Sequence, residues 1–241
     1  MKELKRGSKG YSAETLRKVT ADLRERVWYY AEQLRNGVMM KLSISAGNRK
    51  IGRVWNISLA PVISCGNCAE CSHFCYAVGS VIAYHTAAAA WSKNLAILQH
   101  DRDGYFAQLD AKMSSRTKRR FFRFHVSGEI PDVDYLRRMI ELARKHPDWK
   151  IWTYTKMYGI VNSYCRTYGK VSIPENLVIM FSEWKGTPII NPYGFPEFRV
   201  IFPGDVDQQE QIWTCPGNCE ICIEAGRGCV AGETSKVKLH R

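Results

Sequence analysis

Two short cysteine clusters constrain this chain more than any other feature of its sequence, since they hold eight of its nine cysteines. The first cluster has the spacing C-x2-C-x2-C-x3-C, and the second has C-x3-C-x2-C with one more cysteine downstream. Thiols this dense, behind an N-terminus without the features of a secretory signal, favour metal ligation over a disulfide scaffold. The predicted metal ligands are Cys65, Cys68, Cys71 and Cys75 in the first cluster and Cys215, Cys219, Cys222 and Cys229 in the second.

The first spacing is that of bacterial ferredoxins, so the predicted cofactor is an iron–sulfur cluster of the 4Fe-4S type, in one or two copies. One difference from ferredoxins is that Tyr76, and not a proline, follows the fourth cysteine. Zinc is the alternative, because two cysteines from each cluster would make an ordinary four-thiolate site. The ninth cysteine, Cys165, stands alone on a predicted helix and is expected to lie in the core.

The hydrophobic pattern alternates between strands and helices along most of the chain. Helices are expected at residues 12–36, 78–100, 105–114, 133–145 and 161–168. Strands are expected at 38–47, 121–126, 149–155, 176–182 and 198–203, and the apolar run 53–66 leads into the first cluster. This order predicts parallel strands joined by right-handed crossovers.

The predicted fold is therefore α/β: a parallel-stranded partial β/α barrel with an N-terminal helix and a C-terminal cysteine-rich metal-binding segment. Residues 1–210 would form the barrel domain, which carries the cluster loop 65–75, and residues 211–241 would pack on it. No apolar stretch is long enough to span a bilayer, which predicts no membrane association and a cytoplasmic protein.

Polar residues follow several of the predicted strands, and functional groups collect at the carboxyl ends of such strands. Glu129, Lys156 and Glu183 are therefore expected to converge near the cluster loop, as candidate catalytic residues together with His125. Glu129 would accept an ammonium group, and Lys156 would neutralise a carboxylate or a phosphate. The alternatives are that Glu129 caps or pairs locally and that His125 only fills space.

The order of these motifs resembles the phage protein family called gene product 88. The resemblance rests on Cys75-Tyr76-Ala77, then Arg123 to Glu129, then Trp152 to Lys156, then a terminal Cys-x-x-Cys, and it covers roughly residues 40–230. It implies an architecture more than an activity. It also implies a phage- or prophage-encoded protein that is present in the host cell.

The layout also looks like the radical S-adenosylmethionine superfamily, whose members bind a cluster in the loop after the first strand of a β/α barrel. In that superfamily a Gly-Gly-Glu-Pro-like segment contacts the cofactor's methionine, and residues 126–131 look like a variant of it. This resemblance implies cofactor binding by Ser127, Gly128, Glu129 and Tyr76. The superfamily's C-x3-C-x2-C spacing is absent from residues 65–75 and present in the second cluster, where an auxiliary cluster is expected.

The net charge of +12 favours polyanions, since phosphate contacts release counterions, and nucleic acid is the predicted partner. A solvated basic surface is the alternative.

The predicted function is a radical S-adenosylmethionine-like iron–sulfur enzyme that acts on nucleic acid or peptide. The alternative is a non-catalytic iron–sulfur or zinc protein that binds nucleic acid. If all four cysteines of the first cluster bind one iron–sulfur cluster, no iron is left open for radical chemistry. The sequence does not indicate an oligomeric state.

Overall fold

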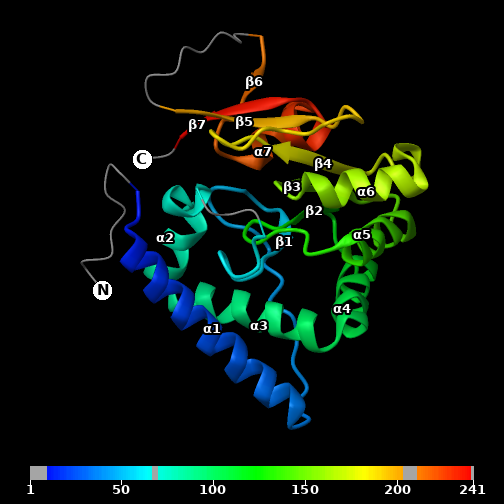
Figure 1. Cartoon of the computed structure of the whole chain (residues 1–241). Helices are drawn as coiled ribbons and strands as arrows, with labels where there is room; N and C mark the ends of the chain where they lie inside the picture. The colour runs from blue at the N-terminus through cyan, green and yellow to red at the C-terminus, as the bar shows by residue number, and fades with distance from the viewer. Residues whose placement is uncertain (1–9, 67–69, 203–210, 240–241) are drawn as a thin grey trace. The chain divides into compact units, whose positions relative to one another are not determined.

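The computed structural model describes residues 10–66, 70–202 and 211–239 (Figure 1). The chain divides into two compact units, which are described separately below. The first unit takes its residues from Met1–Ile44, Ile57–Ser115 and Val126–Glu129. The second takes its residues from Ser45–Asn56, Arg116–His125 and Ile130–Arg241. The chain therefore crosses between the units several times.

The first unit is helical. It contains α1 (Ala13–Arg35), the 3-10 helix η1 (Cys71–Phe74), α2 (Tyr76–Ala83), α3 (His85–His100) and α4 (Arg102–Ser114). The side chain of Ser12 caps α1 by accepting a hydrogen bond from the Thr15 N–H at 3.1 Å, and Gly37 follows the end of the helix with a φ of +80°. The predicted helix over 12–36 is therefore confirmed, and α1 packs along α3 (Figure 1).

Two predicted elements of this unit are wrong. The expected helix over 78–100 breaks at Tyr84, whose extended backbone (φ −130°) separates α2 from α3 and lets both contact α1. The expected strand over 38–47 is also absent, because side-chain amides take its backbone hydrogen bonds. The Leu42 N–H donates to Gln108 Oε1 at 2.8 Å, and the Ser43 N–H donates to Asn94 Oδ1 at 2.8 Å.

The sheet has seven strands in the order β1-β2-β3-β4-β5-β7-β6. The strands are β1 (Trp55–Ile57), β2 (Phe121–Phe124), β3 (Lys150–Thr155), β4 (Leu177–Ser182), β5 (Glu197–Ile201), β6 (Trp213–Thr214) and β7 (Ser235–Lys238). The pairings from β2 through to β6 are all parallel. The predicted α/β class with parallel strands is confirmed.

The helices of the second unit are α5 (Val133–Lys145), α6 (Tyr158–Tyr168) and α7 (Cys219–Ala225), with the short 3-10 helices η2 (Lys170–Ser172) and η3 (Gly228–Ala231). The predicted helix 133–145 is confirmed at both ends. Asp132 caps its N-terminus, because Asp132 Oδ1 accepts the Tyr135 N–H at 2.8 Å. Cys165 is buried on α6, as expected of a core residue.

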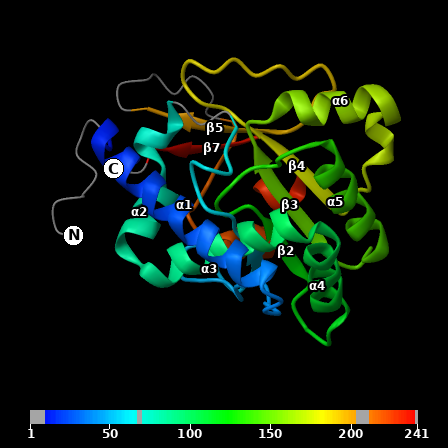
Figure 2. The same ribbon diagram turned by 60° about the horizontal axis from the view of Figure 1, so that its bottom comes forward.

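Strand β4 separates two packed layers. All six of its residues are buried, as is usual for the interior of a parallel sheet. Successive side chains alternate between its faces. The ring of Phe181 contacts Tyr158 of α6 at 4.9 Å between centroids, whereas Met180 packs with Cys229 and Val230. Helix α6 and the cysteine-rich segment therefore cover opposite faces of β4 (Figure 2).

The cysteine-rich segment supplies β6 and β7, two strands that the hydrophobic pattern does not predict. Strand β7 lies between β5 and β6 and pairs with β5 from Phe198↔Ser235 to Ile201↔Lys238. The segment is thus part of the sheet itself. Among the described residues, no helix has the length and hydrophobicity that crossing a membrane requires.

Candidate metal centres

The four cysteines of the second cluster all lie in the second unit, around the short helix α7. Cys215 follows β6, and its N–H donates to the Lys236 carbonyl of β7 at 2.7 Å. Cys219 is the first residue of α7, which Asn218 caps by accepting the Glu220 N–H at 2.9 Å. Cys222 lies one turn further along α7, and Cys229 lies in η3.

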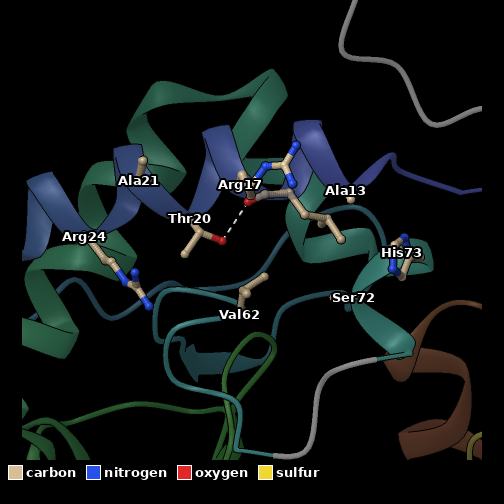
Figure 3. Close-up of a pocket in the computed structure, with 9 residues that line it drawn as sticks. Ala13, Arg17, Thr20, Ala21, Arg24, Val62, Ser72 and His73 are labelled. Carbon is tan, nitrogen blue, oxygen red and sulfur yellow. Dashed lines mark hydrogen bonds between the residues drawn. The ribbon is translucent and has the colours of Figure 1, made fainter.

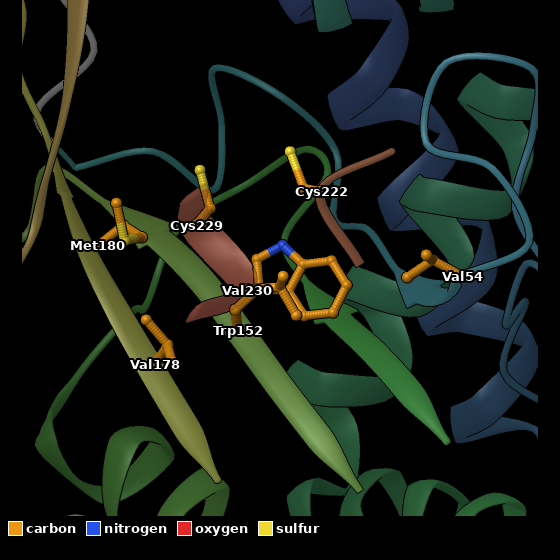
Figure 4. Packing of buried hydrophobic residues seen from close by; sticks show 7 residues of the cluster. All are labelled: Val54, Trp152, Val178, Met180, Cys222, Cys229 and Val230. Carbon is orange, nitrogen blue, oxygen red and sulfur yellow. The ribbon is translucent and has the colours of Figure 1, made fainter. Parts of the chain in front are cut away.

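These four thiols lie close enough to affect one another electrostatically. Cys222 and Cys229 are buried in one apolar cluster with Trp152 and Met180 (Figure 4). Burial raises the pKa of Cys229 to about 11, and the neighbouring charge of Cys215 adds to that rise. Burial likewise raises the pKa values of Cys219 and Cys222, again with a contribution from Cys215. The second unit therefore gathers the four thiols around one region.

Hydrogen-bond donors face these thiols from other elements. The guanidinium of Arg123 on β2 lowers the pKa of Cys219 by its charge and by a hydrogen bond. The hydroxyls of Tyr154 and Ser235 lower the pKa of Cys229 by hydrogen bonding alone. The indole N–H of Trp213 is directed at Cys222 and lowers its pKa, although this buried N–H has no hydrogen bond of normal geometry in the described structure. A thiolate at Cys222 would satisfy it.

The turn between α7 and η3 requires glycine at position 228. Gly228 has a φ of +69°, and a Cβ there would lie 2.7 Å from Trp213 Cδ1 and 3.5 Å from Cys222 Sγ. A side chain at this position would force the turn apart. The glycine therefore lets η3 approach the indole and brings Cys229 back towards α7.

This donor set fits a soft, thiolate-bound metal. Metal-bound sulfurs characteristically accept hydrogen bonds from a surrounding shell, and those bonds tune the site. Within residues 10–66, 70–202 and 211–239, however, no three His, Cys, Asp or Glu side chains are positioned as a group that could hold a metal ion. The metal-binding role of the C-terminal segment therefore stays a prediction.

The first cluster belongs to the first unit, and Cys68 lies outside the described residues. Cys75 is the N-cap residue of α2. Burial raises the pKa of the Cys75 thiol to about 11, and the nearby charges of Cys65 and Cys71 raise it further. The backbone N–H groups at the start of α2 oppose this rise by hydrogen bonding to the sulfur. The three described thiols of this cluster thus lie in one neighbourhood.

The predicted cofactor segment lies against both flanks of this cysteine loop. Ahead of the loop, the Leu59 N–H donates to the Ser127 carbonyl, and the Ser127 hydroxyl donates to the Leu59 carbonyl, both at 2.9 Å. A Cβ at Gly128, where φ is +94°, would lie 2.7 Å from Leu59 Cβ and 2.9 Å from Ser64 Oγ. After the loop, the Tyr76 hydroxyl donates to the Val126 carbonyl.

These contacts bring together the predicted residues Ser127, Gly128 and Tyr76. Glu129, the next residue along, is buried and belongs to the same unit. His73 of the loop is held by the backbone, since its Nδ1 lies 2.6 Å from the Tyr11 carbonyl oxygen.

Lys156 and Glu183 follow neighbouring strands of the second unit. Lys156 Nζ donates to Ser182 Oγ at 3.2 Å, which places it beside the end of β4, where Glu183 forms an ion pair with Arg199 at 3.6 Å. Glu129 belongs to the first unit, so its convergence with these two residues stays a prediction.

His125 is buried at the end of β2 with a φ of +53°, and its Nε2 lies 3.0 Å from the Tyr135 hydroxyl. Burial lowers the pKa of His125 to about 3, with a smaller contribution from the charge of Arg123. The imidazole is therefore neutral near pH 7. That state suits a fixed hydrogen-bonding residue better than a proton-transfer group.

Residues 40–189 match the model of a protein family described as Gene product 88. This range contains the first cysteine cluster, the segment Ser127 to Glu129 and strands β1 to β4. Neither the curated proteins nor the solved structures gave a match to this chain. Because the matched range covers more than half of the 241 residues, the chain belongs to the gene product 88 family.

Proposed function

We propose that this protein is an iron–sulfur protein with one cysteine-ligated centre in each unit, and that it works as a radical S-adenosylmethionine-like enzyme on nucleic acid or peptide. The observation that carries the proposal is the attachment of residues 126–128 to both flanks of the first cysteine loop. Close backbone approach next to a carboxylate suits recognition of an amino-acid-like group.

In the first unit, three of the four cysteines Cys65, Cys68, Cys71 and Cys75 would hold a 4Fe-4S cluster, which leaves one iron open for the cofactor. Such a cluster, when bound, supplies an electron for reductive cleavage of S-adenosylmethionine. Glu129 would accept the ammonium group of that cofactor, and Ser127 and Gly128 fix the segment that presents it. Lys156 and Glu183 are the proposed substrate-side residues.

In the second unit, the four thiols around α7 would form a closed site. The shell of donors from Arg123, Tyr154 and Trp213 would stabilise thiolates there and so favour a metal that remains bound. A second iron–sulfur cluster is the proposed occupant, and four-thiolate zinc is the alternative.

The proposal is tested on anaerobically purified protein by measuring iron, zinc and acid-labile sulfide together with the visible absorption spectrum. Iron and sulfide in equal amounts, with a spectrum that changes when S-adenosylmethionine is added, are expected. Glu129→Gln should retain the iron and lose the response to S-adenosylmethionine, whereas the control Glu141→Gln, on the exposed face of α5, should retain both. Colourless protein that contains only zinc would reject the iron–sulfur proposal.

A second candidate is a non-catalytic metal protein that binds nucleic acid. It is favoured by the closed character of the second centre, where Cys222 and Cys229 are 8% and 7% exposed. In this case the metal only stabilises the fold. The expected signature is a large fall in the melting temperature on metal removal, together with no spectral response to S-adenosylmethionine.

A further inference from the structure

A cleft of about 390 Å³ lies within the first unit, between α1 and the segment around the first cysteine loop (Figure 3). On the helix side it is bounded by Arg17, Thr20 and Arg24, and small alanines leave room between the longer side chains. On the opposite side it is bounded by Val62 and His73. Its volume is within the range of small-ligand sites.

The two arginines share one stripe of the helix, since residues seven apart on an α-helix lie on the same face. Within the described part of the chain, neither Arg17 nor Arg24 forms an ion pair or a side-chain hydrogen bond. By contrast, Arg26 of the same helix is bound to Asp22 at 2.8 Å. Among the described residues, the cleft therefore presents two guanidinium groups that no ion pair holds, although the charge of Arg17 also acts on the nearby carboxylate of Glu14.

The wall opposite the helix carries backbone strain. Val62 has a φ of +68°, a conformation that β-branched residues adopt only when the surrounding structure imposes it. Figure 3 shows its side chain pointing from the loop towards Thr20 of α1. Glycine would relieve this strain but would remove the apolar surface from the cleft, so the valine has a role in lining it.

The basic stretch that the sequence makes most conspicuous, residues 116–120, is less available. In the second unit, Arg119 is paired with Glu220 at 2.5 Å and Arg120 is paired with Asp148. These carboxylates neutralise part of its charge. Arg17 and Arg24 thus remain the stronger candidates for contact with an anion.

We propose that this cleft binds a nucleotide, either free or as one unit of a single-stranded nucleic acid. The guanidinium groups would contact phosphate oxygens, since arginine suits the geometry of those oxygens. The base would pack on Val62 and on the side chain of Leu16, both of which line the cleft. This site goes beyond the proposed radical chemistry, because it would bind a nucleotide through α1 and Val62.

The test uses the full chain and fluorescence anisotropy with a short labelled single-stranded oligonucleotide over a range of salt concentrations. The double variant Arg17→Gln/Arg24→Gln should bind about tenfold more weakly for each contact removed. It should also lower the slope of log affinity against log salt by about 1.4, as two lost phosphate contacts require. The matched control Arg26→Gln, whose arginine is already paired on the same helix, should change neither quantity.

Val62→Gly provides a second variant that tests the apolar wall. It should leave the melting temperature unchanged or raise it, because glycine accepts the positive φ, and it should weaken binding without altering the salt slope. Displacement of the oligonucleotide by a nucleoside monophosphate would identify a site for one nucleotide. Displacement only by longer strands would identify a single-strand site.

Three results would overturn the proposal: no binding by the wild-type chain at low salt, equal effects of the Arg17/Arg24 and Arg26 changes, or equal displacement by an acidic peptide. Binding is measured without S-adenosylmethionine. A failure to bind the oligonucleotide therefore does not contradict the radical-enzyme proposal. Conversely, a protein whose spectrum does not respond to S-adenosylmethionine would not contradict the nucleotide-binding proposal.

Discussion

The indole of Trp213 occupies the space that a side chain at position 228 would need, at 2.7 Å from the ideal Cβ position of Gly228. The same indole directs its N–H at Cys222, and Arg227 stacks over its ring at 5.0 Å. One aromatic residue thus joins β6, the turn after α7 and a buried thiol. The arrangement of the second cysteine cluster depends on this contact.

Replacing Gly228 by alanine should destabilise the protein by several kcal/mol. The cost combines the strain of a positive φ, about 1–2 kcal/mol, with displacement of the Trp213 ring. Gly226→Ala is the matched control, since Gly226 has a φ of +62° with no atom near its Cβ position, so it carries the strain alone. Denaturant unfolding measures the free energy of unfolding of both variants. Equal decreases in the two variants would contradict the packing argument.

If a metal holds Cys222 as a thiolate, Trp213→Phe should weaken its binding by about tenfold, because the change removes the indole N–H that such a thiolate would accept and retains most of the ring. Competition with a chelator measures the affinity. Trp184→Phe is the control, since that ring packs on Phe202 at 5.1 Å between centroids. If the two variants retain metal equally well, the Trp213 N–H does not support the thiolate.

Cys219→Ala should lower metal content and melting temperature together, because the binding free energy of a structural metal contributes to folding. Cys165→Ala should keep all the metal, since that thiol is buried on α6 away from the second cluster. Elemental analysis and thermal unfolding of the two variants provide the comparison. Unchanged metal and melting behaviour in Cys219→Ala would show that the C-terminal cysteines are incidental.

His125 should make stability depend on pH. Folding lowers its pKa from the ordinary value of 6.5 to about 3, so between these values the unfolded chain binds more protons than the folded one. The contribution of His125 is fully present above pH 6.5 and falls by a few kcal/mol as the pH drops towards 3.

The variant His125→Asn tests this dependence, because asparagine tolerates a positive φ and does not titrate. The variant should be less stable than wild type near pH 7, because it has lost the contact with Tyr135. The difference in the free energy of unfolding between the two proteins should become smaller as the pH falls. Denaturant unfolding at several pH values measures the difference between the two proteins. Curves that stay parallel would show that His125 does not titrate on unfolding.

Much of the fold follows from local sequence signals. Helix α5 has apolar residues on one stripe and Asp132 as its cap, and the apolar run of β4 indicates an interior strand. The break at Tyr84 could not be predicted, because no glycine or proline marks it within an alanine-rich run. The missing strand at 38–47 depends on amides of α3 and α4, which only the folded chain brings near.

The residues of the candidate site likewise fall into those that local sequence signals identify and those that only the folded chain brings together. The cysteine spacing identifies Cys215 to Cys229 as one group, because a tight loop needs no knowledge of the rest of the chain. Arg123 and Tyr154, which face these thiols, come from strands that lie far away in sequence. Only Trp213 carried a local signal, as an aromatic residue two positions before the first cysteine of the cluster.

The position of β7 sets the order in which the second unit can be completed during synthesis. Strand β5 is made before its parallel neighbour, Ser235–Lys238, which emerges from the ribosome only after all four cysteines of the second cluster. Until then one edge of β5 has no strand to pair with, and unpaired edges promote aggregation. Metal capture by the emerging thiols would hold α7 and η3 in place while β7 arrives. Expression in metal-depleted medium should therefore lower the yield of soluble protein.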